Sequence, residues 1–376
     1  MGQYKQQFLR SFDYIESLRQ TSPLNDNHWL LCSGPFMPDY FTIHHMGRNK
    51  WERLMNRYAP YWLGRWRPSY VVVSRFIGLF YDCMSPHDTE SKQWLLNHLK
   101  RLPKPMSSWT LVLFFLFMEH FLRGLHEDKM DFSEVNHLLN QRAIDFLHQY
   151  HSNITRASLC CRLQMACLAN WFDVVVPQFS STIDDSFQRI FQSMDQPQWD
   201  GISQEMATVN RAKSILYEVD NTGEIIFDLW AIQAMIQQNK SVTIVAKSAN
   251  ILNDATQQHV QEIIHQYSVF QPLKEAFKSG GLRVIIANDF PMVGKYLPRV
   301  LDAYKDAFLA CDLVILKGQA NFQTMPFSHY KIRCYQHQYK KPIMYCFVAK
   351  SPIIQICFQS LNRRSIQLGD PVIYLV

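Results

Sequence analysis

The chain has 376 residues, 47% of them hydrophobic, which is enough for one large domain or two ordinary domains with sizeable cores. The formal net charge is +6 and the basic residues are spread along the chain, so neither nucleic-acid binding nor membrane-surface binding is indicated. The nine cysteines form no CxxC pair and no zinc pattern, which favours free thiols in a reducing, cytoplasmic compartment. The first residues contain no apolar signal-peptide core, and the composition leaves the oligomeric state open.

The first half, residues 1–210, is predicted to be an all-helical domain. Its most hydrophobic run, residues 109–118, is too short to span a bilayer and predicts a buried helix. Apolar residues elsewhere recur at spacings of three and four, which is typical of amphipathic helices. These helices are predicted at residues 3–20, 90–102, 133–150 and 154–175.

The second half, residues 211–376, alternates apolar strands with helices. Strands are predicted at residues 214–220, 241–248, 282–289, 311–318, 341–350 and 370–376. Helices are predicted between the first four of them, at residues 224–238, 254–268 and 296–310. Continuously apolar strands that alternate with helices predict a parallel sheet covered on both faces.

Polar side chains gather where these strands end, and ligands bind at that edge of a parallel sheet. They are Asp220, Asn221, Asn253, Asp254, Asn288, Asp289, Lys317, Asn321 and Lys350. Each has a structural alternative, as a helix cap, a turn residue or a solvated strand end. Together they favour a hard divalent cation held by carboxylate and amide oxygens, with Asp220, Asn221 and Asp254 fitting Mg²⁺ or Mn²⁺. The lysines would then supply positive charge to phosphoryl oxygens.

Several familiar nucleotide and phosphate templates do not fit. Only Gly223 follows the first strand closely, so the GxGxxG signature of dinucleotide binding is absent. Neither a P-loop nor a GxSxG nucleophile elbow occurs. The aspartyl-nucleophile phosphatases of the haloacid dehalogenase type need a second acid where this chain has Thr222.

Four segments occur in an order that resembles the damage-control phosphatases, a metal-dependent family formerly grouped as a domain of unknown function. The segments read YEVDNTGEIIFDLWAI, ILNDAT, CDLVILKGQANFQTM and VAKSPIIQI. LANWFDVVV, with Asn170 and Asp173, resembles a further element from the helical half of that family. The resemblance runs from about Leu163 to the end of the sequence.

The resemblance implies an α/β protein, with an all-helical domain over residues 1–210 and a Rossmann-like domain with a mostly parallel sheet over residues 211–376. The implied activity is divalent-metal-dependent hydrolysis of a small phosphomonoester, such as a sugar phosphate or a damaged phosphometabolite. Mn²⁺ or Mg²⁺, with Co²⁺ or Ni²⁺ as further candidates, would bind Asp220, Asn221 and Asp254. The implied catalytic residues are Asp220, Asp254, Lys317 and Lys350, and the implied substrate-binding residues are Asn170, Asp173, Glu224, Asn253 and Asn321.

The chain departs from the family pattern in the loop after the third strand, at residues 287–297, and at several single positions. Thr222 replaces Ala, Ala320 replaces Gly, Gln323 replaces Glu and Ser351 replaces Cys. Two alternatives therefore accompany the phosphatase hypothesis. One is an interaction or regulatory protein that keeps the fold without catalysis. The other is a hydrolase or transferase that acts on a modified protein or nucleotide with the same metal site.

Overall fold

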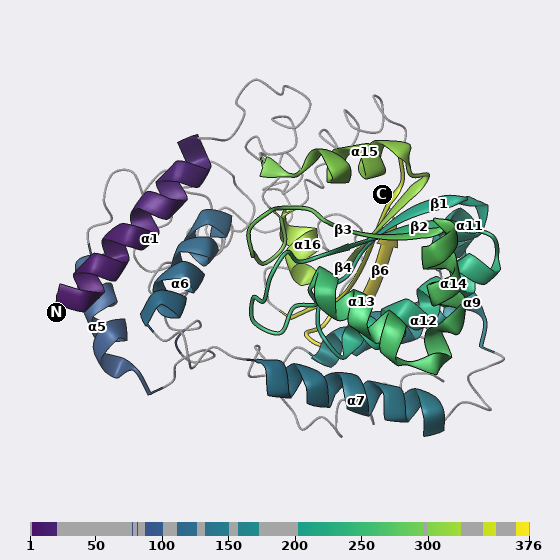
Figure 1. The fold of residues 1–376 in the computed structure, drawn as a ribbon, viewed down its shortest axis with the longest axis horizontal. Coiled ribbons are helices and arrows are strands. Elements are labelled where there is room, and N and C mark those ends of the chain that lie inside the picture. The colour runs from purple at the N-terminus through teal and green to yellow at the C-terminus, as the bar shows by residue number, and fades with distance from the viewer. Residues whose placement is uncertain are drawn as a thin grey trace.

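The fold is known from a computed structural model. It describes residues 2–20, 77, 81, 87–100, 111–125, 132–149, 157–172, 202–295, 299–324, 341–350 and 366–375. The first helices are α1 (Gly2–Gln20), α5 (Thr89–His98) and α6 (Leu111–Leu125), and they form the group at the left of Figure 1. Their apolar faces pack together, with the rings of Phe8 and Phe117 edge to face at 5.3 Å. No helix in these described ranges is both long enough and apolar enough to cross a membrane.

The remaining helices of the first half lie against the second half. They are α7 (Ser133–Gln149), α9 (Leu159–Leu168), the short 3-10 helix η5 (Ala169–Phe172) and α11 (Ser203–Arg211). Both α7 and α9 pack on α12 (Glu224–Gln237), and α7 runs along the lower side of the molecule in Figure 1. The largest core therefore joins residues from both sides of position 210.

A six-stranded sheet with the order β3-β2-β1-β4-β5-β6 organises the second half. Its strands are β1 (Ser214–Glu218), β2 (Ser241–Ala246), β3 (Leu282–Ile286), β4 (Leu313–Lys317), β5 (Ile343–Val348) and β6 (Pro371–Leu375). The first five strands run parallel, and β6 pairs antiparallel with β5. Strand order reverses at β1, because the chain moves outward to β3 and then returns to β4 on the other side. The carboxyl ends of β1 and β4 thus flank a topological switch point.

Helices cover both faces of this sheet. The remaining helical elements are α13 (Gln257–Gln266), η7 (Ser268–Phe270), α14 (Gln271–Ser279), α15 (Asp302–Ala310) and α16 (Gln319–Thr324). Buried residues of α9, α12, α13 and α14 share one core with the sheet, whereas α15 lies on the opposite side in Figure 1. Twelve consecutive residues of α12, Glu224 to Met235, are buried, as expected for a helix packed between a sheet and other helices.

The predicted fold class is confirmed: the described part is a mixed α/β structure with a mostly parallel sheet. The six predicted strands all form. The first five end one to three residues earlier than predicted, because residues such as Asp220, Asp289 and Lys350 follow the strand rather than belong to it. The division into domains at residue 210 stays a prediction.

Candidate functional site

Two acid–amide pairs, Asp220–Asn221 after β1 and Asn253–Asp254 in the loop after β2, meet at this edge of the sheet. Asn221 and Asp254 face each other in an isolated antiparallel bridge. The Ala255 amide donates to the Asp220 carbonyl at 2.7 Å, and the Asn253 carbonyl accepts an amide N–H of the β1 turn at 2.8 Å. Backbone hydrogen bonds therefore hold together residues that are more than thirty positions apart in the sequence, and the predicted metal ligands lie in one place.

The second pair does not serve as a helix cap. The cap of α13 is Thr256, whose hydroxyl accepts the His259 amide at 3.1 Å. Asn253 and Asp254 precede this cap, and both are buried. The Asn253 side chain donates to the Phe172 carbonyl at 3.4 Å, and the Asp254 carboxylate lies 3.4 Å from the Lys247 ammonium group, so neither side chain caps the helix.

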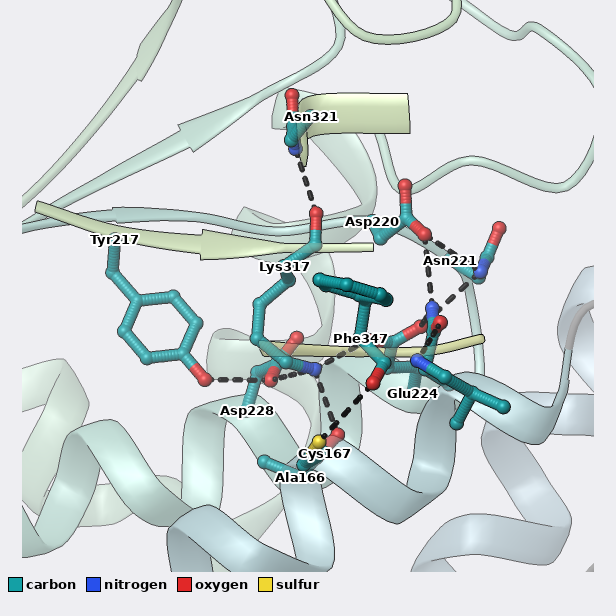
Figure 2. Close-up of polar contacts among 12 residues, drawn as sticks. Ala166, Cys167, Tyr217, Asp220, Asn221, Glu224, Asp228, Lys317, Asn321 and Phe347 are labelled. Atoms are coloured by element: carbon teal, nitrogen blue, oxygen red, sulfur yellow. Dashed lines mark hydrogen bonds and ion pairs between the residues drawn. The ribbon is translucent and has the colours of Figure 1, made fainter. Parts of the chain in front are cut away.

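Two amide side chains orient the carboxylate of Asp220. Its Oδ2 accepts the Nδ2 groups of Asn170 at 3.0 Å and of Asn221 at 3.1 Å. The same two amides donate to Glu224 Oε2, at 2.8 and 3.2 Å (Figure 2). Asn170 also accepts the Val348 amide through Oδ1 at 3.0 Å. Asn170, from the predicted helical half, therefore links the β1 turn to the end of β5.

The Asp220 carboxylate lies directly on the backbone of Gly318, the residue after β4. Gly318 has φ of +78°, and a Cβ atom there would overlap the carboxylate of Asp220. Only a glycine satisfies both the left-handed backbone and this close approach. At the switch point between β1 and β4, the Asp220 carboxylate thus packs directly against Gly318.

A Gly318→Ala substitution is expected to displace the Asp220 carboxylate and to weaken Mn²⁺ binding by at least ~10-fold. Gly280→Ala is a matched control, because Gly280 also has a left-handed φ of +80° but a Cβ atom there meets nothing within 4 Å. Both variants should lose about 1–2 kcal/mol of stability from the backbone conformation. Calorimetric titration with Mn²⁺ separates the two effects, and equal Mn²⁺ affinities in the two variants would contradict the prediction.

Lys317 lies beneath this cluster rather than at its surface. Its fully buried ammonium group forms ion pairs with Glu224 and, at 3.0 Å, with Asp228, and donates to the Ala166 carbonyl at 2.7 Å (Figure 2). Tyr217 donates its hydroxyl to Asp228 at 2.7 Å. Lys317 therefore stabilises Glu224 through a buried ion pair. The Lys317 ammonium group does not reach the sheet edge, so it is not placed as the predicted substrate contact.

Burial governs the ionisation of this group of residues. It raises the pKa of Asp228 to about 7, although the neighbouring Lys317 ammonium opposes the shift. Burial would lower the pKa of Lys317, but the carboxylates of Asp228 and Glu224 outweigh it and raise that pKa above its usual value. Lys317 is therefore a permanent cation in the folded chain.

A hollow beside the acid–amide cluster has an empty volume of about 310 Å³, part of which is open solvent. The ends of β1 and β2, the loop after β3 and Asn321 of α16 line it. Polar groups reach it from Glu218, Lys247 and Asn288, and Phe290 and Met292 give it an apolar wall. A cleft with an apolar wall and a few convergent polar groups is typical of a small-molecule site.

A second buried ion pair fixes one side of this hollow. Lys295 contacts Glu218 Oε2 at 2.6 Å and donates to Asn321 Oδ1 at 3.1 Å. Tyr304 donates to the other Glu218 oxygen at 2.5 Å. Asn321, predicted to bind substrate, thus lines the hollow and also donates to the Lys317 carbonyl at 2.8 Å.

Lys350 follows β5 and is also buried. Its backbone N–H donates to the Gln319 side chain at 2.9 Å, which places it beside the start of α16. Two residues discussed from the sequence, Asp173 and Ser351, lie outside the described residues.

Helix α7 contributes two residues that the sequence reasoning missed. Asn136 Oδ1 accepts the Thr222 hydroxyl at 2.8 Å, and Asn140 Oδ1 accepts the Gly223 amide at 2.7 Å. Two amides four positions apart share one face of a helix, which was the available signal. These contacts fix the turn that carries Asp220.

The donor set fits a hard divalent cation through its chemistry. Within the described ranges, no three His, Cys, Asp or Glu side chains gather as metal ligands. The predicted set instead combines two carboxylates, Asp220 and Asp254, with the amide of Asn221, and a cation such as Mg²⁺ completes such a set with water and phosphate. Gly318, which has no side chain, leaves the space that the Asp220 carboxylate occupies at this edge.

Comparison with known proteins places these features in a family. Two curated relatives are 28% identical to the chain: an uncharacterized protein from Methanocaldococcus jannaschii over 161 residues, and a damage-control phosphatase from Pyrococcus horikoshii over 167 residues. Each match covers 43% of this chain, and 44% and 52% of the respective relatives, so the chain spans about half their length.

A solved structure and a family profile cover more of the chain. The crystal structure of a DUF89 family protein from Pyrococcus horikoshii superposes with a TM-score of 0.60 at 20% identity, covering 81% of this chain and 96% of that one. It shows that the fold is shared. The profile of the damage-control phosphatase ARMT1-like domain matches residues 88–358, well over half of the sequence. The chain therefore belongs to the family of proteins with a damage-control phosphatase ARMT1-like domain.

Proposed function

We propose that the chain is a divalent-metal-dependent phosphatase that hydrolyses a small phosphomonoester, such as a sugar phosphate or a damaged phosphometabolite. The observation that carries this proposal is the backbone bridge that brings Asp220 and Asn221 to Asp254 beside a hollow. Membership of a phosphatase family supports it, as does the name of the Pyrococcus horikoshii relative. The five described cysteines carry free thiols, which fits the cytoplasm as the proposed compartment.

Asp220, Asn221 and Asp254 would hold Mn²⁺ or Mg²⁺ in this proposal. When bound, the cation would polarise a phosphoryl oxygen and offset the charge that develops on it. Asn170 and Asn221 keep the Asp220 carboxylate oriented through their amide hydrogen bonds. Glu224 holds the same two amides in place, so it acts by positioning.

Among the predicted site residues that the structure describes, Asn321 lines the hollow. Asn321 faces it from α16 and limits the space for the organic part of a substrate. The carboxylates of Asp220 and Asp254 are the nearest candidates to accept a proton from an attacking water. Lys350 is proposed to face the phosphoryl group from the end of β5.

The proposal is tested by assaying the purified protein against a panel of phosphorylated metabolites and p-nitrophenyl phosphate, with and without Mn²⁺. Hydrolysis that requires the metal and favours small phosphomonoesters is the expected result. Addition of EDTA should abolish the activity and excess Mn²⁺ should restore it. Absence of phosphate release under every metal condition would overturn the proposed function and favour a non-catalytic binding role.

A further inference from the structure

The lysines at the carboxyl edge of the sheet differ in where their ammonium groups lie. Lys317 is fully buried and paired with Glu224 and Asp228. Lys295 is 2% exposed, and its ammonium group contacts Glu218 and Asn321. Both cations are committed to protein carboxylates, so neither provides uncompensated positive charge to a ligand.

Lys247 is placed differently. It follows β2 directly, and among the residues that the structure describes it is the lysine that lines the hollow. Its ammonium group donates to the Gly294 carbonyl at 3.0 Å and lies 3.4 Å from Asp254 Oδ2. Lys247 therefore connects a proposed metal ligand with the loop that closes the hollow.

The contact between Lys247 and Asp254 leaves the ammonium group able to bind a further acceptor. A charge-assisted hydrogen bond between nitrogen and oxygen is usually about 2.7–2.9 Å long, so 3.4 Å is a loose ion pair. An ammonium group carries three N–H donors, and Gly294 and Asp254 account for two acceptors. One donor can serve an oxygen atom in the hollow.

The charge around Lys247 favours an anionic ligand at that point. Only 8% of Lys247 is exposed, so its charge is poorly screened by solvent and acts strongly on a group inside the hollow. The Ser248 hydroxyl, next in sequence, also lines the hollow, and no acceptor or donor within the described ranges bonds to its buried oxygen. An ammonium group and a hydroxyl together match the acceptor oxygens of a phosphoryl group.

We infer that Lys247 is the residue that binds the phosphoryl group of the substrate from the β2 side of the hollow. This inference rests on the proposed function, because it assigns a contact for a phosphoryl group next to Asp254. It gives the charge-supplying role to a lysine that lies in the lining of the hollow, while Lys317 supports the cluster from below.

The test compares Lys247→Met with Lys240→Met. Lys240 precedes β2 at the opposite edge of the sheet, is 7% exposed, and donates to the carbonyls of Asn210 and Ala212, both at 2.8 Å. The two variants thus remove a buried, carbonyl-bound ammonium group from either end of one strand. Binding of inorganic phosphate is measured by calorimetry in the presence of Mg²⁺, and binding of Mn²⁺ is measured separately.

Lys247→Met is expected to weaken phosphate binding by about 10- to 100-fold, the usual cost of losing a charged hydrogen bond. The same variant should bind Mn²⁺ at least as tightly as the wild type, because a cation next to Asp254 has been removed. Lys247→Arg should recover part of the phosphate affinity, and Lys240→Met should bind phosphate like the wild type. Unchanged phosphate affinity in Lys247→Met, a parallel loss in Lys240→Met, or loss of Mn²⁺ binding would each overturn the inference.

Hydrolysis of p-nitrophenyl phosphate separates this inference from the proposed function. Phosphate binding that depends on Lys247, without any turnover by the wild type, would sink the phosphatase proposal and leave the binding assignment intact. Metal-dependent turnover that is the same in Lys247→Met and wild type would overturn the assignment of Lys247 and leave the phosphatase proposal intact. A wild-type protein that binds no phosphate overturns the inference outright.

Discussion

Asp220→Asn is expected to weaken Mn²⁺ binding by more than ~100-fold and to reduce metal-dependent phosphomonoester hydrolysis in proportion, since even residues that only support metal ligands cost 10- to 100-fold. The substitution removes one carboxylate charge. It also presents an amide to Asn170 and Asn221, whose N–H groups both need an acceptor at Oδ2. The asparagine must turn its oxygen toward these donors, which leaves its NH₂ group facing any cation.

The control for this variant is Asp302→Asn, because the Asp302 side chain is 90% exposed at the start of α15. Calorimetry with Mn²⁺ and the p-nitrophenyl phosphate assay give the readout, and circular dichroism checks that both variants fold. Asp302→Asn should match the wild type throughout. Undiminished metal-dependent hydrolysis by a folded Asp220→Asn protein would contradict the assignment of Asp220.

Lys317→Met is expected to lower the free energy of unfolding by about 3–5 kcal/mol, the usual cost of removing one partner from a buried ion pair. The substitution leaves Glu224 and Asp228 without their cation in a fully buried environment. Glu224 would then no longer hold the Asn170 amide in its orientation, so the affinity for Mn²⁺ should fall together with the stability.

Urea unfolding followed by circular dichroism measures the first effect. Lys278→Met is the control, because Lys278 is exposed in the last turn of α14 and its loss should change stability by less than about 1 kcal/mol. A Lys317→Met protein as stable as Lys278→Met would show that the buried ion pairs contribute little. Adding Asp228→Asn to Lys317→Met should recover part of the stability, since one unpaired carboxylate is removed.

The juxtaposition of the two acid–amide pairs was predictable from the sequence. Parallel strands that alternate with helices bring their carboxyl ends to one edge, so polar residues after β1 and β2 had to be neighbours. The sequence does not reveal the hydrogen bond from the Ala255 amide to the Asp220 carbonyl, which joins the two loops and sets the spacing of the pairs. That bond depends on a register that only the folded sheet defines.

The direction of the Lys317 side chain was not predictable. Alternate residues of β4, Leu313 and Ile315, belong to the core under α9 and α12, and Lys317 continues on that face. Strands of a parallel sheet are apolar on both faces, so their sequences do not show which face a given residue takes. The prediction therefore placed Lys317 at the correct edge without identifying Asp228 as its partner.

Lys247 and Lys295 also escaped the sequence reasoning. Lys247 lies in an isolated bridge directly after β2, within the strand predicted at residues 241–248, and Lys295 lies in a loop. A strand that is apolar on both faces does not show which way Lys247 points, and a loop has no periodicity that could orient Lys295. Lys295 lies in the loop of residues 287–297, where the chain departs from the family pattern. Its contacts with Glu218 and Asn321 join three segments that are distant along the chain.

The apolar wall of the hollow, formed by the loop after β3, packs against the N-terminal helices. Phe290 and Met292 line the hollow and pack in the same core as Phe8 of α1 and Phe117 of α6. Under the proposed function, substitutions in helices that carry no proposed catalytic group are expected to change substrate selectivity through this wall. Exchanging α1 and α6 between relatives, with the metal ligands untouched, offers a route to altered selectivity.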